Sequence, residues 1–139
     1  MKVAVICANG KAGRLITKEA VDRGLDVTAI VRSKNENATT KVIQKDLFDL
    51  TVDDLRGFDV IIDAFGTWRP ETFAQHGSSL KKLCDMLAGT DTRLLIVGGA
   101  GCLYVNDGRT LMLIDAPDFP EAFKPLAQAE TKAFLALQK

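Results

Sequence analysis

The chain has 139 residues, with 18 basic and 18 acidic side chains, so its formal net charge is zero. This length predicts a single domain, residues 1–139, that can bury a sizeable core. The balanced charge argues against nucleic acid or an anionic membrane surface as the main partner.

Targeting and redox signals are weak in this sequence. The apolar or Gly run at 94–105 is too short to span a bilayer, and the run at 3–8 is shorter than a signal-peptide core. Cys7, Cys84 and Cys102 form no Cys-x-x-Cys pair, and there is one His. We therefore expect a cytoplasmic protein with reduced thiols, no metal site and no membrane partner.

Strands and helices are expected to alternate. Short apolar runs predict five strands, at residues 2–7, 26–31, 41–45, 59–64 and 93–97. Helices are expected at 11–23, 51–57, 71–88 and from 120 or 124 to 138. A hairpin is predicted after the fifth strand, with arms at 103–105 and 110–113 around the turn Asn106-Asp107-Gly108.

Several local signals support these helices. The first has an apolar face of Ala12, Leu15, Ile16 and Ala20, and Gly24 ends it. Thr51 stands three residues before Asp54, as in a capping box. Leu80, Leu83, Cys84 and Leu87 follow helical spacing.

Apolar strands alternating with helices predict a parallel sheet that is covered on both faces. Right-handed crossovers then favour a doubly wound α/β fold with strand order 3-2-1-4-5. Ligands of such sheets bind where the strand order reverses, here between the first and fourth strands, beside Gly10.

The segment Ala8–Gly13 joins the first strand to the first helix and is a candidate phosphate loop. Gly10 would let the backbone approach a pyrophosphate, and Gly13 would let the helix pack closely on the sheet. The alternative is an ordinary strand–helix turn that needs small residues. Cys7 stands where the usual pattern has Gly, as either a reactive thiol or a small buried side chain.

Arg32, Ser33 and Lys34 follow the second strand, where an NAD site usually carries Asp or Glu. A guanidinium pairs well with a 2′-phosphate, and Ser33 can donate a hydrogen bond to it. The segment therefore favours NADP, with NAD possible. The alternative is a solvated basic loop.

Further candidates follow the third and fourth strands. Asp46 and Leu47 would border the adenine, or Asp46 is simply solvated. Ala64-Phe65-Gly66 would let the backbone pass under the ribose and nicotinamide, with Phe65 flanking the cofactor or filling the core. Thr67, Trp68 and Arg69 could touch a substrate, and His76 is either a proton donor or a surface or capping residue.

The usual acid/base residues for alcohol–ketone chemistry are missing. The segment Gly98–Gly101 has no Ser, and Tyr104 is followed four residues later by Gly108 rather than Lys. A Tyr-x-x-x-Lys pair is therefore absent.

A family resemblance rests on five segments of the chain. They are CANGKAG at 7–13, TAIVRS at 28–33, QKDLFDL at 44–50, DAFG at 63–66 and RLLIVGGAG at 93–101. Together the chain resembles the atypical short-chain dehydrogenase/reductases of the NmrA-like, NAD(P)H-binding type, in particular NADH-flavin reductases.

The resemblance implies a Rossmann fold that binds NAD(P). By position, Asn9, Gly10, Lys11 and Ala12 would contact the pyrophosphate, and Arg32 the 2′-phosphate. Asp46 and Leu47 would contact the adenine. Ala64, Phe65 and Gly66 would lie at the ribose and nicotinamide.

Two departures accompany the resemblance. Cys7 replaces the first family glycine, and family members continue past Lys139, so the usual C-terminal part is expected to be missing, by truncation or in a naturally short form. We predict an NADPH-preferring oxidoreductase that transfers hydride to a flavin- or quinone-like acceptor, with a homodimer possible. The alternatives are a non-catalytic NADP-binding sensor and a Rossmann domain whose site has decayed.

Overall fold

The computed structural model describes residues 1–138. The chain divides into two compact units, which are treated separately below. The first contains residues 1–65 and 82–97, and the second contains residues 66–81 and the chain after Val97. The expectation of a single domain stays a prediction.

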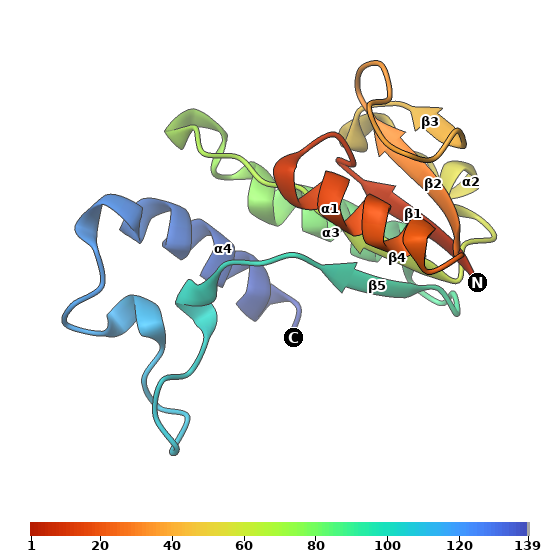
Figure 1. Cartoon of the computed structure of the whole chain (residues 1–139). Coiled ribbons are helices and arrows are strands. Elements are labelled where there is room, and N and C mark those ends of the chain that lie inside the picture. The colour runs from red at the N-terminus through yellow and green to blue at the C-terminus, as the bar shows by residue number, and fades with distance from the viewer. Residues whose placement is uncertain (139) are drawn as a thin grey trace. The chain divides into compact units, whose positions relative to one another are not determined.

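The first unit is built on a five-stranded, all-parallel sheet with the order β3-β2-β1-β4-β5 (Figure 1). Its strands are β1 (Lys2–Ile6), β2 (Asp26–Val31), β3 (Val42–Gln44), β4 (Val60–Asp63) and β5 (Arg93–Ile96). The predicted α/β class and strand order are confirmed, and each predicted strand is present within two residues of its expected ends.

The strand register brings the loops after four strands to one edge of the sheet. Ile6 pairs with Ile30 on one side and with Asp63 on the other. Val31 in turn pairs with Gln44 of β3. Because all of these strands are parallel, residues that follow β1, β2, β3 and β4 leave the sheet close together.

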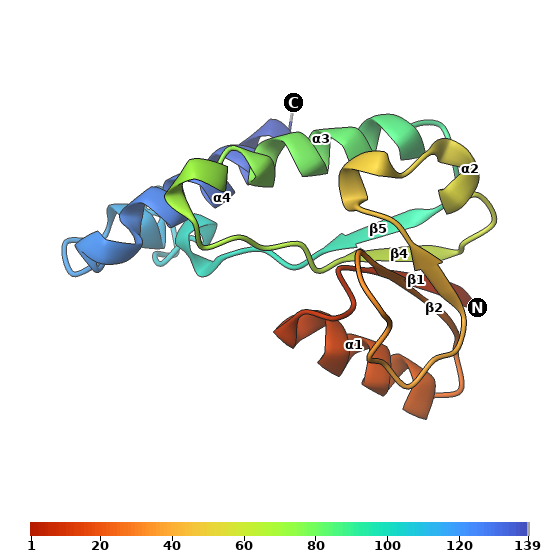
Figure 2. The same ribbon diagram turned by 90° about the horizontal axis from the view of Figure 1, so that it is seen from above.

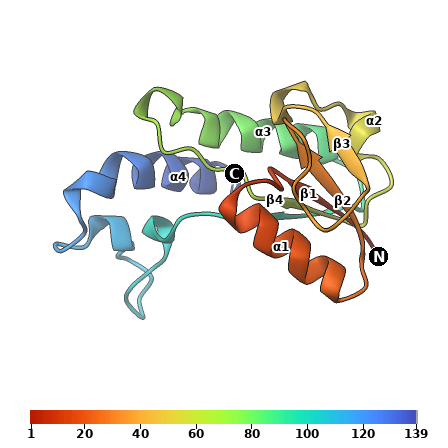
Figure 3. The ribbon, with the colours of Figure 1, turned by 45° about the horizontal axis from the view of Figure 1, so that its top comes forward.

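Helices cover both faces of this sheet (Figures 2 and 3). The helix α1 (Lys11–Asp22) covers one face, and α2 (Val52–Leu55) and the last residues of α3 (Gln75–Leu87) cover the other. Alternate strand residues serve the two cores, since Val3 and Val5 pack on the α1 side and Ala4 and Ile6 on the other. This two-sided burial explains the near-continuous apolar strands.

The helix ends follow the predicted local signals. Gly24 and Gly57 have φ values of +73° and +84°, which glycine adopts without steric penalty. The capping box of Thr51 and Asp54 forms in full, with each side chain bonding the other residue's backbone N–H.

The predicted apolar face of α1 is wrong in one residue. Leu15 is 70% exposed, whereas Gly13, Thr17 and Ala20 are buried. The packed face therefore follows the small residues, which let the helix approach the sheet, rather than the largest side chain. In α3, by contrast, Leu80, Leu83 and Leu87 are buried as predicted.

In the second unit, α3 begins later than the predicted residue 71. A separate 3₁₀ turn, Pro70–Thr72, precedes it, and the Thr72 hydroxyl closes this turn by donating to the Arg69 carbonyl at 2.9 Å. The last helix, α4, runs from Lys124 to Ala136, after another 3₁₀ turn at Glu121–Phe123. No helix within residues 1–138 is long and apolar enough to cross a membrane.

The predicted hairpin is reduced to a single antiparallel bridge, between Tyr104 and Met112. The Asn106 side chain organises its loop by accepting hydrogen bonds from the Thr110 and Leu111 N–H groups at 3.0 Å. The left-handed residue is Arg109, with φ +52°, and not Gly108. The loop is therefore wider than the predicted turn, and regular strands do not extend from it.

Candidate functional site

The loop between β1 and α1 is held close to the sheet. The Gly10 N–H donates to the Cys7 carbonyl at 2.9 Å, and the Ala8 N–H donates to the Ile30 carbonyl at 3.2 Å. A Cβ atom on Gly13 would overlap the Cys7 carbonyl oxygen and lie 2.8 Å from the Ala8 Cα. The predicted role of Gly13 in close helix–sheet packing is therefore confirmed.

The start of α1 is suited to an anion. Gly10 is the N-cap and brings no side chain to the first-turn N–H groups, and the first turn contains no acidic residue. A Cβ atom on Gly10 would lie 3.2 Å from the Cys7 carbonyl oxygen, which is a tight contact, so glycine suits this position. The residues present thus fit a pyrophosphate: exposed amides and the positive helix end would hold it.

Cys7 adopts a backbone conformation that glycine normally supplies, with φ +57°. Its side chain packs against the core beneath the loop. Burial, with a contribution from the Asp63 carboxylate, raises the pKa of the Cys7 thiol from 9.0 to about 12. The thiol is therefore neutral at physiological pH, which supports the small buried side chain over the reactive thiol.

Asn9 connects the phosphate loop to the segment that follows β2. Its Nδ2 donates to the Lys34 carbonyl at 2.9 Å and to Ser33 Oγ at 3.4 Å. Its Oδ1 accepts from the Glu36 N–H at 3.1 Å and from Asn37 Nδ2 at 2.9 Å. The amide is therefore fully used within the protein, and a pyrophosphate contact from Asn9 falls to its backbone.

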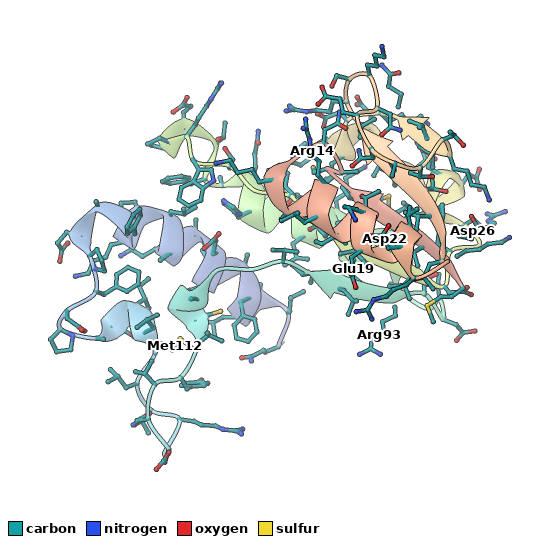
Figure 4. The ribbon with its side chains drawn as sticks, in the orientation of Figure 1. Arg14, Glu19, Asp22, Asp26, Arg93 and Met112 are labelled. Carbon is teal, nitrogen blue, oxygen red and sulfur yellow. The ribbon has the colours of Figure 1, made fainter. Side chains whose placement is uncertain are left out.

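Arg14 belongs to the same arrangement. Its Nε donates to the Asn9 carbonyl at 2.8 Å, and its guanidinium forms an ion pair with Glu36. Figure 4 shows Arg14 at the end of α1 nearest the loop that follows β2, with Glu19 and Asp22 further along the helix.

The predicted 2′-phosphate residues lie in this loop and are accessible. Arg32, Ser33 and Lys34 are exposed, and the Arg32 side chain is 79% exposed. The Arg32 guanidinium lies 3.8 Å from an Asp46 oxygen, a loose pairing that leaves its other nitrogens available.

The two predicted adenine residues have different surroundings. The Asp46 carboxylate accepts from the Phe48 N–H at 2.9 Å and so begins the 3₁₀ turn Leu47–Asp49. The Leu47 side chain is buried in the core, at 4% exposed. Any contact of Leu47 with a ligand would therefore come from its backbone.

At the end of β4, Asp63 is 4% exposed, and its Oδ1 accepts from the Phe65 N–H at 3.0 Å. The Phe65 ring is half-buried and meets Phe48 edge to face, with ring centroids 6.5 Å apart. Phe65 thus packs on the core, and Ala64 lies beside it at the sheet edge. Gly66 already belongs to the second unit.

The second unit contains the residues predicted near a substrate. Thr67 is tied to Thr72 through their hydroxyls at 2.5 Å, and its carbonyl lies 3.1 Å from His76 Nε2. Trp68 is 76% exposed, and Arg69 is exposed as well. The His76 ring therefore ties the start of α3 to the loop that precedes it, and the side chain is partly buried.

Two glycines of the segment after β5 are closely packed in the second unit. The Glu130 carboxylate occupies the position that a Cβ on Gly99 would take. A Cβ on Gly101 would lie 3.0 Å from the Ala127 Cβ. The glycines of this segment therefore allow close approach of α4 within the second unit.

No local sequence pattern predicts a role for Arg14, Glu36 or Asn37. Arg14 lies one residue past the glycine pattern, and Glu36 and Asn37 fall in a polar stretch that reads as an ordinary loop. Only the side-chain hydrogen bonds across 22 to 28 residues of sequence reveal them.

Comparison with known proteins gives three kinds of match. The model of the family described as NAD(P)H-binding matches residues 7–139. The uncharacterized protein YwnB of Bacillus subtilis is 41% identical, over 100% of this chain and 66% of its own length. Solved structures match as well, among them the following two.

The first structure is a "putative NADH-flavin reductase" from Streptococcus pneumoniae, 54% identical with a TM-score of 0.96, covering 99% of this chain and 66% of the other. The second is a "putative epimerase" from Bacteroides thetaiotaomicron, 34% identical with a TM-score of 0.76, covering 96% and 62%. This chain therefore spans about two thirds of the length of these relatives.

Proposed function

Since the chain belongs to the NAD(P)H-binding family, we propose that it is an NAD(P)H-dependent oxidoreductase that prefers NADPH and reduces a flavin- or quinone-like acceptor. The observation that carries the proposal is the sheet edge of the first unit. There, the open N-terminus of α1 and the exposed Arg32-Ser33 segment leave adjacent strands on the same side.

Each part of this edge would have its own task. The backbone N–H groups of Asn9, Lys11 and Ala12 would bind the pyrophosphate, and Gly10, whose own N–H bonds the Cys7 carbonyl, would let it approach the backbone. Arg32 and Ser33 would bind the 2′-phosphate. The backbone of Asp46 and Leu47 would border the adenine, and Ala64 and Phe65 would border the ribose and nicotinamide.

When bound, a reduced nicotinamide supplies a hydride to an acceptor stacked on it. Such a transfer depends on alignment and exclusion of water more than on a strong acid or base. The lack of a Tyr-x-x-x-Lys pair is therefore compatible with flavin or quinone reduction. The Streptococcus pneumoniae relative, named for NADH and flavin, supports this choice of acceptor.

Calorimetric titration of the purified chain with NADPH and NADH tests the cofactor assignment. We expect tighter binding of NADPH, and Arg32→Ala should weaken NADPH by about tenfold or more, because a charge-assisted pair with the 2′-phosphate is lost. Arg23→Ala is the matched control, since Arg23 is similarly exposed but pairs with Glu19 on α1. Equal losses in both variants would contradict the assignment.

Oxidation of NADPH is then followed at 340 nm with FMN, FAD and a simple quinone as acceptors. Turnover with any of them supports the reductase. Tight binding without turnover favours a second candidate, a non-catalytic NADP-binding sensor. That candidate is supported by the segment Gly98–Gly101 after β5, which contains no serine that could act in catalysis.

A further inference from the structure

Glu36, in the loop that holds Arg32 and Ser33, is already paired with a cation from α1. Glu36 forms an ion pair with Arg14 across 22 residues of sequence. Both side chains remain about half exposed, at 51% for Arg14 and 54% for Glu36. The pair is therefore open to a ligand that arrives from solvent.

Asn9 fixes both members of this pair. Its carbonyl accepts from Arg14 Nε at 2.8 Å, and its side-chain oxygen accepts from the Glu36 backbone N–H at 3.1 Å. The hydrogen bonds from Asn9 thus restrain both partners, so the ion pair costs less side-chain entropy than a pair of two freely moving side chains.

The same amide reaches Ser33, one of the residues proposed for the 2′-phosphate. Asn9 Nδ2 lies 3.4 Å from Ser33 Oγ, and Asn9 O lies 2.8 Å from Arg14 Nε. Ser33 and Arg14 thus bond the same residue, and a phosphate bound at Ser33 would have the Arg14 guanidinium and the Glu36 carboxylate as charged neighbours. If both anions approach the Arg14 guanidinium, their mutual repulsion reduces the favourable interaction that each one makes with it.

We propose that Glu36 is an internal competitor for Arg14 that sets how strongly the site discriminates NADPH from NADH. With NADH, which has no 2′-phosphate, the Arg14–Glu36 pair stays intact. With NADPH, the 2′-phosphate takes Arg14 from Glu36, and the broken ion pair and the repulsion by Glu36 reduce the net gain. This inference rests on the proposed cofactor site.

The test uses two probes that differ only in the phosphate concerned, adenosine 2′,5′-bisphosphate and adenosine 5′-monophosphate, titrated by calorimetry into the full chain. Glu36→Gln should raise the affinity for the bisphosphate about three- to fivefold, as expected for removal of one exposed charge interaction. The affinity for the monophosphate should be nearly unchanged. The gain should shrink in 0.5 M salt, because exposed charges are screened.

Glu19→Gln is the matched control. Glu19 is 61% exposed and pairs with Arg23 at 2.7 Å on the same unit, so its removal changes net charge equally without touching the Asn9 loop. This variant should leave the affinity for both probes unchanged. An equal gain in both variants would show that overall charge, and not competition for Arg14, is responsible.

A double-mutant cycle isolates the coupling. Arg14→Gln should weaken binding of the bisphosphate more than binding of the monophosphate. In the Arg14→Gln background, adding Glu36→Gln should no longer raise the affinity for the bisphosphate. If Glu36→Gln fails to fold, Glu36→Asp withdraws the carboxylate by one methylene and should shift affinity in the same direction.

The outcomes distinguish failure of the Glu36 inference from failure of the proposed cofactor site. If Glu36→Gln weakens both probes equally, or changes neither, Glu36 only supports the loop and the inference is overturned, whereas the cofactor site stands. If the wild-type chain binds neither probe nor either dinucleotide, the proposed function fails and the inference fails with it.

Discussion

The carbonyl oxygen of Cys7 occupies space that a side chain on Gly13 would need. A Cβ at position 13 would also lie 2.8 Å from the Ala8 Cα, and both obstacles are backbone atoms. The close contact between α1 and the preceding loop therefore requires that residue 13 has no side chain.

We expect Gly13→Ala to destabilise the protein. Overpacking against backbone costs about 1–3 kcal/mol, and this outweighs the helix-propensity gain of about 1 kcal/mol. Gly10→Ala is the comparison, because its Cβ would lie 3.2 Å from the Cys7 carbonyl oxygen, a tight contact but a longer one than the overlap at Gly13. Urea unfolding should show the larger loss in Gly13→Ala, whereas NADPH titration of Gly10→Ala should show weakened binding with little loss of stability.

At position 7 we expect glycine to give a more stable protein than alanine, the reverse of the usual order of stability. The φ of Cys7 is +57°, a region that costs a residue with a Cβ about 1–2 kcal/mol. Cys7→Gly should therefore be more stable than Cys7→Ala, by about 1 kcal/mol after the entropy cost of glycine is subtracted. Thermal unfolding of the two variants compares them directly, and a more stable Cys7→Ala would show that the turn holds no strain.

The Cys7 thiol should make stability fall at alkaline pH. Its pKa rises from 9.0 to about 12 in the folded protein, so between these values the unfolded chain has lost a proton that the folded chain retains. Stability is therefore favoured below pH 9 and declines as the pH rises toward 12. Urea unfolding of wild type and Cys7→Ala across this range should show a steeper decline for wild type, and parallel curves would contradict it.

Asp54 should titrate far below an ordinary aspartate. The hydrogen bonds from Lys45 Nζ, at 2.8 Å, and from the Thr51 backbone and hydroxyl lower the pKa of this carboxyl from 3.8 to about 2. Its ionised form stabilises the fold above pH 3.8, and that contribution disappears as the pH falls toward 2. An NMR titration should show this midpoint, and Lys45→Ala should raise it, whereas Lys41→Ala, which removes a lysine paired with Asp26, should not.

Periodic and capping signals in the sequence predicted most of the first unit. Strand order follows from apolar runs and right-handed crossovers, and the Thr51 capping box is a local pattern that the sequence states directly. Leu15 was misplaced because helical spacing cannot tell which of two neighbouring faces packs, and close packing selected Gly13 and Thr17.

The parts that escaped prediction depend on side chains acting at a distance. The sequence predicts a hairpin at 103–113 with a turn at residues 106–108, but the Asn106 side chain accepts hydrogen bonds from two N–H groups and widens the loop. Arg14 and Glu36 meet only because the loops after β1 and β2 leave the sheet at one edge. Such pairings follow from the tertiary fold and have no signature in local sequence.

The four hydrogen bonds of the Asn9 side chain imply that the loop after β2 is ordered before any ligand arrives. A site shaped in advance saves the entropy of ordering on association and can be entered without a slow rearrangement. The Glu36 amide hydrogen, bonded to Asn9 and not to a strand partner, reports this order directly. Its exchange with deuterated solvent should be slow in the free protein and fast in Asn9→Ala.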